Sequence, residues 1–423
     1  MTCSGQNWMA IKTPAILGGS PSVTADHAVN CQWPVLDEQD FLQVRKVMLD
    51  GDISTHPIRY ELEDAYAQLF NQKYALSHNN GTSALFASFF ALGLGAGDEV
   101  LVTSATWWSS VLPMLWLGAV PVFCECETEN LGISVADMKN KLTNNTKAIV
   151  VVHLWGMPSK MHEIRQFANQ HNLNIIEDAS HAHGASIDGR LCGSFGDVSV
   201  FSLQGDKLSP AGEGGMLLTD DYGIYEKALC FGDVSRIYSL DTPAQRFAAT
   251  SFGIKTRMAP LSAAVGLSQL KKLEQHNQCR NDNIEYISKS LETMGFDTYL
   301  GSERYHRTYF EFLIKWKPEC GLQQQTLIRA LNAEGAAITA PRYPMLHQQP
   351  FFVEGEWNKL ARIENGLNRY PYSQVSLPVT EAESRLMIRL PHFSTATQDF
   401  LDQYLDAFDK VLLNAKAIAA KFK

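Results

Sequence analysis

The sequence predicts an α/β protein with a mostly parallel sheet covered by helices on both faces, followed by a smaller α+β domain. From residue 74 to residue 219, short apolar runs alternate with segments of helical periodicity. Some of these runs, such as AIVVV at 148–152 and NII at 174–176, are apolar without alternation. Strands buried on both faces have this composition, and a strand–helix–strand repeat requires the crossover connections of a parallel sheet.

The alternating part divides into strands and helices that follow one another closely. Each strand is assigned to an apolar run, and each helix to a segment with apolar residues at helical spacing, such as Leu85, Phe89 and Leu92. Pro113 is expected to bend one of the helices. The expected strands are 74–80, 99–105, 120–126, 148–156, 174–178, 198–203 and 215–219, and the expected helices are 81–95, 107–118, 134–142, 161–172 and 222–231.

The residue pattern changes at Pro260, where one long stretch of helical periodicity begins. The segment 260–295 is predicted to form one long helix whose apolar stripe could join a large domain to a smaller one. After it we expect a strand at 308–316 and helices at 323–335 and 401–422. We therefore predict an N-terminal arm at 1–35, a large domain at 36–290 and a small C-terminal domain at 291–423.

The composition is that of an ordinary globular protein. Of 423 residues, 45% are hydrophobic and 19% are charged, and the net charge is −9, which does not favour nucleic acid or an anionic membrane as a partner. Neither the N-terminal residues nor the run VLPMLWLGAVPVF is typical of a signal peptide or a membrane span, so we expect a cytoplasmic protein. Eight cysteines do not suggest a disulfide framework, and Cys124 and Cys126 are interpreted as reduced thiols and not as metal ligands.

Candidate ligand-binding residues follow the expected strands. In open α/β sheets, ligands bind at the carboxyl ends of the strands. Gly81-Thr82-Ser83 begins a helix after the first strand, where free N–H groups and hydroxyls suit a phosphate. A Ser or Thr at such a position is, however, often only a helix cap. Trp107, after the second strand, could stack on a planar ring or belong to the core.

An acid and a lysine follow two of the buried strands. Asp178 ends the strand 174–178, where it either is a cap or ion-pair partner or holds a proton on a heterocyclic nitrogen. Lys207 follows 198–203 in the stretch FSLQGDKLSPAGEGG, where it is either a solvated loop lysine or a nucleophile toward a carbonyl group. A phosphate site, a stacking ring, an acid and a lysine together match one cofactor, pyridoxal 5′-phosphate (PLP).

The order of these motifs resembles that of the PLP-dependent sugar aminotransferases of the StrS/DegT type, which have the aspartate aminotransferase fold. The resemblance extends from ILGGSP to PRYPMLHQQPFF, and its most specific parts are NNGTSALFASFFALGLGAGDEVLVTSATWW, AIVVVHLWGMP, IIEDASHAHGA and FSLQGDKLSPAGEGG. It implies an enzyme whose large domain holds a seven-stranded sheet. It also implies that Lys207 forms a Schiff base with the cofactor and moves the proton, and that Asp178 pairs with the pyridine nitrogen.

The resemblance implies further contacts to the cofactor. Trp107 would stack on the ring, and His181 would lie near the ring hydroxyl. His183 is expected to pack structurally, outside the site. The phosphate would be held by Gly81, Thr82, Ser83 and Ser202.

Three positions depart from the family's usual pattern. Leu208 stands where Asn often follows the lysine, and Gln204 stands where His is frequent. Lys255, in FGIKTRM, stands where an Asn reaches the phosphate of the neighbouring subunit's cofactor. A lysine could serve that phosphate as a point charge, or the contact is lost. Because the family builds its site across a dimer, the resemblance also implies a homodimer.

The resemblance implies an oxo-sugar as acceptor and glutamate, or else glutamine, as amino donor. Overall likeness favours the C8 aldehyde of 3-deoxy-manno-octulosonate, which would give 8-amino-3,8-dideoxy-manno-octulosonate for lipopolysaccharide. The alternatives are a nucleotide-linked ketohexose and an oxo-cyclitol of the aminoglycoside type. A dehydratase with His in place of the lysine, and a non-catalytic regulator, are disfavoured because Lys207 and Asp178 are both present.

The octulosonate carries a carboxylate, so its binding requires a cation away from the cofactor phosphate. Arg342, Arg236 and Arg257 are the candidates, and each is as readily explained as part of a structural ion pair. Gln204 and His347 are further candidate substrate contacts.

Overall fold

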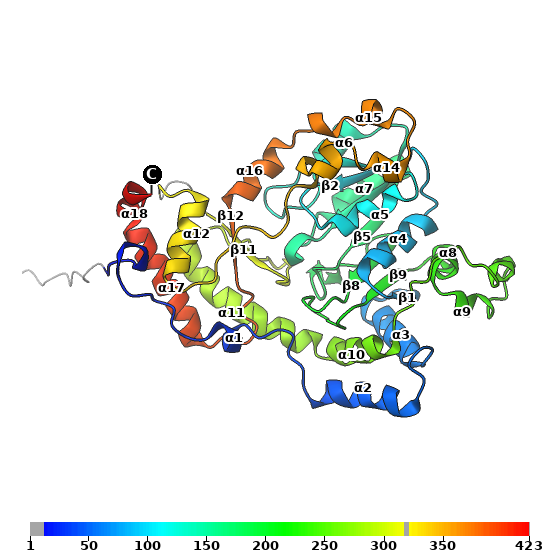
Figure 1. Cartoon of the computed structure of the whole chain (residues 1–423), viewed down its shortest axis with the longest axis horizontal. Helices are drawn as coiled ribbons and strands as arrows, with labels where there is room; N and C mark the ends of the chain where they lie inside the picture. Colours follow the sequence, from blue (N-terminus) through cyan, green and yellow to red (C-terminus); the bar gives the residue numbers. More distant parts are fainter. Residues whose placement is uncertain (1–11, 317–320, 423) are drawn as a thin grey trace, which may run out of the picture.

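The computed structural model describes residues 12–316 and 321–422. Its main feature is a seven-stranded sheet with the strand order β1-β9-β8-β5-β4-β2-β3 (Figure 1). Among the described residues, the other six strands of this sheet run in one direction and β9 runs in the opposite one, so the predicted mostly parallel α/β fold is confirmed. The strands are β1 (Tyr74–His78), β2 (Glu99–Thr103), β3 (Val120–Cys124), β4 (Thr146–Val152), β5 (Asn174–Asp178), β8 (Val198–Ser202) and β9 (Gly215–Thr219).

Helices flank the sheet. Helix α4 (Gly81–Ala91) begins directly after β1, where the Asn80 side chain accepts a hydrogen bond from the Ser83 N–H and caps the helix. It packs against β8 and β9, and α3 (Ile58–Phe70) packs against β1. The other helices of this part include α2 (Glu38–Asp50), α5 (Leu112–Leu115), α6 (Val135–Lys141), α7 (Met161–His171), α8 (Tyr222–Gly232) and α9 (Val234–Ile237).

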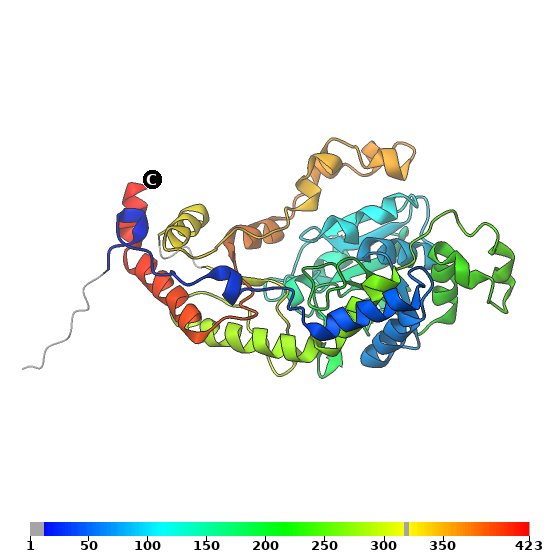
Figure 2. The ribbon, with the colours of Figure 1, turned by 60° about the horizontal axis from the view of Figure 1, so that its bottom comes forward.

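Three of the expected helices differ from the prediction. The segment 401–422 is divided at Asn414 (φ −105°) into α17 (Gln398–Leu413) and α18 (Ala415–Lys421). The segment 107–118 forms only a 3₁₀ turn at Trp108–Ser110 and the four-residue α5, because Val111 leaves the helical region (φ −125°) and Pro113 has no N–H to continue an earlier turn. The segment 260–295 forms two helices, α10 (Pro260–Lys271) and α11 (Leu273–Thr293), which meet at Lys272 (φ −99°). The view in Figure 2 shows these two helices following one another as a rod.

A second hydrophobic core lies at the far end of this rod. It surrounds a two-stranded sheet of β11 (Phe312–Lys315) and β12 (Met387–Leu390), which pair antiparallel. Figure 1 shows α11 reaching from the large sheet to this part of the molecule. The second core also includes residues of α12 (Gln324–Ala333), α17 (Gln398–Leu413) and α18 (Ala415–Lys421).

The segment between α12 and β12 returns to the first core. Tyr343, Leu346, Phe352, Trp357 and Tyr372 are buried against side chains of the large sheet and its helices, so a stretch from late in the sequence closes over the ends of the strands. The division at residues 35 and 290 stays a prediction. The short helices here are α13 (Pro350–Val353), α14 (Asn358–Ala361), α15 (Gly366–Arg369) and α16 (Pro378–Leu386).

A small three-stranded sheet lies beside these two cores. Its strands are β6 (Ser186–Ile187), β7 (Arg190–Leu191) and β10 (Tyr305–His306), in the order β10-β6-β7. Near the N-terminus lies α1 (His27–Asn30). Among the helices of the described residues, none is both long enough and apolar enough to cross a bilayer.

Candidate active site

A cavity of about 550 Å³ lies where the parallel strands end. Residues at or just after the carboxyl ends of β1, β2, β4, β5 and β8 line it, as expected for an open α/β sheet. Phe310, Arg342 and Tyr343 complete the lining from the C-terminal part of the chain. Of the residues predicted from the sequence, those that line the cavity are Gly81, Thr82, Trp107, Asp178, His181, Ser202, Gln204, Lys207 and Arg342.

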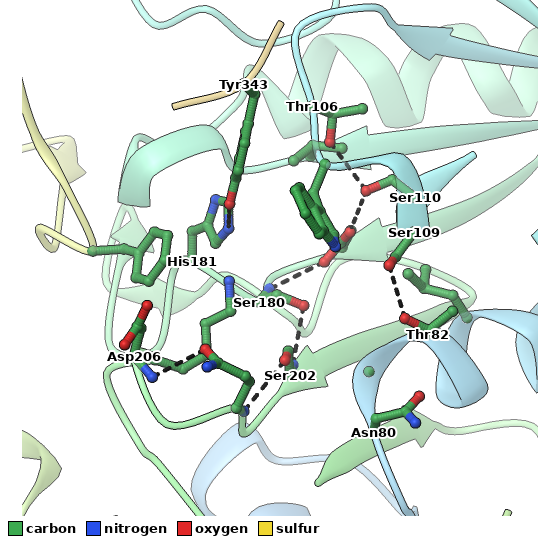
Figure 3. A pocket seen from close by; sticks show the side chains of 18 of the residues that line it. Asn80, Thr82, Thr106, Ser109, Ser110, Ser180, His181, Ser202, Asp206 and Tyr343 are labelled. Carbon is green, nitrogen blue, oxygen red and sulfur yellow. Dashed lines mark hydrogen bonds between the residues drawn. The ribbon is translucent and has the colours of Figure 1, made fainter. Parts of the chain in front are cut away.

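One end of the cavity is built for an anion (Figure 3). The N-terminus of α4 points into it, and the hydroxyls of Thr82 and Ser202 lie beside this helix end. Thr82 Oγ1 is 2.7 Å from Ser109 Oγ. A Cβ on Gly81 would lie 2.8 Å from the Cβ of Ser202, so only glycine lets the helix start approach β8 this closely. Ser83, which was also expected to hold the phosphate, does not line the cavity, and its N–H donates to the Asn80 cap.

Lys207 is buried at the floor of the cavity. Its Nζ lies 4.0 Å from the centroid of the Phe310 ring. Trp33 Nε1 donates a hydrogen bond to the Lys207 carbonyl oxygen (3.1 Å) and fixes the backbone of this loop. Burial lowers the pKa of the Lys207 amine to about 8, although the nearby Asp178 carboxylate opposes the shift. The amine is therefore a better nucleophile and proton acceptor near neutral pH than a solvated lysine.

Asp178 ends β5 and is held by two hydrogen bonds. Ser110 Oγ donates to Asp178 Oδ2 at 2.6 Å, and the Ser180 N–H donates to Oδ1 at 3.2 Å. Thr106 Oγ1 lies 3.0 Å from Ser110 Oγ, so a short chain of hydroxyls supports the carboxylate (Figure 3). Sequence reasoning missed Thr106, Ser109 and Ser110. Their signal was the presence of four hydroxyl-bearing residues within the seven positions 104–110, just after a buried strand.

His181 lies in a stack of aromatic rings. Its ring is 4.2 Å from that of Phe310 and 5.6 Å from that of Trp155, nearly parallel to both. Burial, with the Lys207 and Arg342 charges, holds the pKa of the imidazole well below its usual value. The Trp155 N–H donates to Nδ1 (3.4 Å), so the ring proton belongs on Nε2, which lies 3.1 Å from the Tyr343 hydroxyl.

Tyr343 is the cavity residue that comes from furthest along the chain. Its ring packs at 4.5 Å on Trp155 and at 5.4 Å from Trp107. The Trp107 side chain is 45% exposed, so one of its faces is free to receive a planar ring. Tyr343 was missed from the sequence, although the segment PRYPMLHQQPFF around it had drawn attention to Arg342 and His347.

The structure keeps several candidate residues away from the cavity. His347 is buried, with Nδ1 2.7 Å from Ser104 Oγ and Nε2 3.3 Å from Glu381. Arg236 pairs with Glu63 at 2.8 Å, and Arg257 donates to two serine hydroxyls. Lys255 is exposed and does not line the cavity of its own chain.

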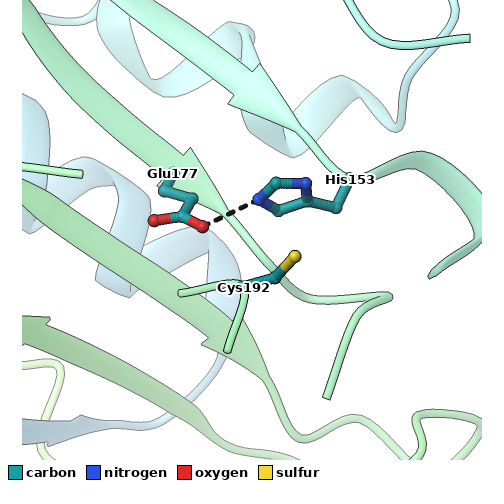
Figure 4. Close-up of side chains that lie close together, drawn as sticks. All are labelled: His153, Glu177 and Cys192. Atoms are coloured by element: carbon teal, nitrogen blue, oxygen red, sulfur yellow. Dashed lines mark hydrogen bonds and ion pairs between the residues drawn. The ribbon is translucent and has the colours of Figure 1, made fainter. Parts of the chain in front are cut away.

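A second cluster of reactive side chains lies behind Asp178. Glu177, His153 and Cys192 are fully buried, with His153 Nε2 2.8 Å from Glu177 Oε1 (Figure 4). The Glu177 carboxylate also accepts from backbone N–H groups of residues 193, 195 and 196. The Ser159 N–H donates to His153 Nδ1 at 3.0 Å. Hydrogen bonds thus already occupy the carboxylate and the imidazole, and the cluster ties β4, β5 and the 193–196 turn together.

Comparison with known proteins matches this arrangement to a family. A model of the DegT/DnrJ/EryC1/StrS aminotransferase family matches residues 34–408. The chain belongs to this family. It is therefore a PLP-dependent aminotransferase that acts on small sugar substrates with an amino donor, as the sequence motifs predict.

Two curated relatives and one solved structure show how far the likeness extends. A Streptoalloteichus tenebrarius protein, provisionally named L-glutamine:3-amino-2,3-dideoxy-scyllo-inosose aminotransferase, is 29% identical over 96% of this chain and 99% of its own length. GDP-perosamine synthase of Escherichia coli O157:H7 is 32% identical over 70% of this chain and 78% of its own. The aminotransferase of Psychrobacter cryohalolentis has a TM-score of 0.81 at 28% identity and covers 91% of this chain and 99% of its own.

The cavity residues fit PLP. The helix start with the Thr82 and Ser202 hydroxyls suits its phosphate, and the close approach of Gly81 to Ser202 shapes a tight anion pocket. Asp178 offers an acceptor for a protonated pyridine nitrogen, and Lys207 offers an amine of lowered pKa for the aldehyde. The donor set thus has a partner for the phosphate, the pyridine nitrogen and the aldehyde of the cofactor.

Proposed function

We propose that the protein transfers an amino group from glutamate or glutamine to the keto group of an oxo-cyclitol. The provisional name of the S. tenebrarius relative, which matches over nearly the whole length of both chains, supports this acceptor. GDP-perosamine synthase supports a nucleotide-linked ketohexose as the second candidate. Neither relative is named for an octulosonate, so the alternatives expected from the sequence are better supported than the octulosonate itself.

The charge of the cavity is the observation on which the choice of acceptor rests. Within the described residues, the cations of the lining are Lys207 and Arg342, and the Arg342 guanidinium already faces Glu311 and Asp206. Asp206 and Glu213 are exposed acids at the same cavity. An uncharged polyol ring, or one that carries an amino group, suits such surroundings. A diphosphate would require further cations beside these acids.

The chain's own residues have separate roles in this reaction. PLP, when bound, supplies an electron-withdrawing ring that carries the amino group from donor to acceptor. Lys207, with its lowered pKa, takes and returns the proton at the substrate carbon. Asp178, held by Ser110, keeps a proton on the pyridine nitrogen. Thr82, Ser202 and the α4 terminus hold the phosphate, while Trp107 covers a ring face.

His181 acts as a neutral donor in this proposal. Its low pKa keeps it uncharged, and its Nε2–H faces the cavity beside Tyr343. A neutral imidazole can donate to the ring hydroxyl oxygen of PLP without adding a second positive charge next to Lys207. The Phe310 and Trp155 rings hold the imidazole plane in place.

The family resemblance also supports a homodimer in which Lys255 reaches the phosphate of the neighbouring subunit's cofactor. Lys255 is exposed, as this contact requires. Sedimentation should give a dimer, and Lys255→Ala should weaken PLP binding severalfold. A monomeric protein with full PLP affinity would contradict both parts.

A half-reaction series tests the acceptor. The PLP-loaded protein is treated with glutamate until its visible band is lost, and is then freed of glutamate. An oxo-cyclitol, a GDP-linked ketohexose and the C8-oxo octulosonate are added separately, with Lys207→Ala protein as the control. We expect the band to return with the oxo-cyclitol. Return with the ketohexose alone would select the second candidate, and return with the octulosonate alone would overturn both.

A further inference from the structure

We propose that Arg342 binds the α-carboxylate of the amino donor, at a position that the Asp206 side chain occupies when no donor is bound. This inference rests on the proposed aminotransferase reaction and adds a binding site for its first substrate. Glutamate and glutamine share an α-amino and an α-carboxylate group, so a donor site must place an amine near Lys207 and a cation close to it.

Arg342 is oriented by a buried acid. Its Nε lies 2.5 Å from Glu311 Oε1, and the Glu311 side chain is only 4% exposed. Arg389 Nη1 lies 3.0 Å from the same oxygen. Two guanidinium groups therefore share one carboxylate, which leaves a positive charge in excess and fixes the plane of the Arg342 fork.

The remaining partner of Arg342 is weakly held. Asp206 Oδ2 lies 3.3 Å from Arg342 Nη1, and the Asp206 side chain is 58% exposed. An exposed pair at this distance contributes at most about 1 kcal/mol, so a substrate carboxylate can displace it. Asp206 directly precedes Lys207 in the chain, so the carboxylate that leaves and the amine that reacts belong to the same loop.

The position of Arg342 suits an α-amino acid. Lys207 Nζ lies 4.0 Å and Arg342 Cζ lies 5.7 Å from the centroid of the Phe310 ring. In an amino acid the nitrogen and the carboxyl carbon are about 2.5 Å apart. Both groups lie at this ring and line the same cavity, so a donor whose nitrogen replaces Lys207 Nζ can direct its α-carboxylate toward the guanidinium.

No other cation competes for this role among the described residues of the lining. Burial keeps His181 neutral, and Lys207 is committed to the cofactor. Arg342 is 39% exposed, so it is accessible from the cavity although Glu311 anchors it. The sequence had pointed to Arg342 for a carboxylate of the acceptor, whereas the geometry assigns it to the donor.

A comparison of two donors tests the assignment. Glutamate and isoglutamine, its α-carboxamide, are compared in the first half-reaction by loss of the visible band. The wild type should prefer glutamate, and Arg342→Gln should reduce this preference by about 10- to 150-fold, the range for one hydrogen bond to a charged group. Arg342→Lys should retain part of the preference. An unchanged preference in Arg342→Gln would overturn the proposal.

Two further measurements exclude a merely structural effect. Asp206→Asn should lower the KM for glutamate, because the competing carboxylate is gone. Calorimetry with glutarate should give a Kd at least tenfold weaker for holo-Arg342→Gln than for the wild-type holoenzyme. If Arg342→Gln instead raised only the KM of the acceptor, the site would belong to the acceptor and the proposal would be wrong. A wild type that no donor bleaches, but that binds glutarate through Arg342, would contradict the aminotransferase function and not the anion site.

Discussion

Because Lys207 is buried, we expect its charge to lower the free energy of unfolding of the cofactor-free protein in a defined pH range. Its amine titrates at about 8 in the folded chain and near 10.4 when unfolded. Below pH 8 both states carry the proton, and folding buries a charge. Above about pH 10.5 both states are neutral. The unfolded state binds more protons between these limits, so the contribution of Lys207 to stability rises with pH across this window.

The size of this effect on stability follows from the lowering of the pKa of Lys207. A lowering of roughly 2.5 pKa units corresponds to about 3 kcal/mol. The variant Lys207→Met removes the charge, so its free energy of unfolding should exceed that of the wild type by about 3 kcal/mol at pH 7.5. This advantage should decline through pH 8 to 10.5 and then level off.

Urea unfolding of both cofactor-free proteins at several pH values between 7 and 11 measures the difference. Lys410→Met is the matched control, because Lys410 is equally buried but lies 2.7 Å from Glu334. Removing Lys410 leaves the Glu334 carboxylate buried without a cation beside it and should destabilise the protein at every pH in the range. If the wild-type and Lys207→Met curves stay parallel from pH 8 to 10.5, burial does not lower the pKa of Lys207 and the reasoning fails.

Three other variants test the site and its support. Ser110→Ala removes a hydrogen bond to a buried charge, so we expect the proton-transfer step, followed by stopped-flow absorption, to slow about tenfold or more; an unchanged rate would remove Ser110 from the site. Gly81→Ala places a Cβ 2.8 Å from that of Ser202, and PLP binding, titrated by fluorescence, should weaken at least tenfold, with Gly95→Ala as the control in open space. Glu177→Gln should cost about 3 kcal/mol of unfolding free energy, and full stability would contradict the role of the buried cluster.

The strands were predictable because each one is a short apolar run buried on both faces. All seven runs form strands of the large sheet, and their order placed Gly81, Asp178 and Lys207 at ligand-binding ends. This step needs only local pattern and the general rule for parallel sheets.

What the sequence could not predict depends on contacts between distant segments. The Tyr343 hydroxyl meets His181 across 162 positions of sequence, and Ser110 meets Asp178 across 68. The break at Lys272 was hidden because the apolar stripe continues through it. His347 lies near the cavity residues in sequence, but its bonds to Ser104 and Glu381 turn it away from them.

The central claim is that Lys207 holds PLP in this cavity. Borohydride reduction of the PLP-loaded protein, followed by proteolysis and mass spectrometry, tests it most directly. The account predicts that the added pyridoxyl mass lies on the peptide that contains Lys207, and that Lys207→Ala binds PLP without retaining this mass. Stoichiometric label on another lysine, with Lys207 unmodified, would contradict the account.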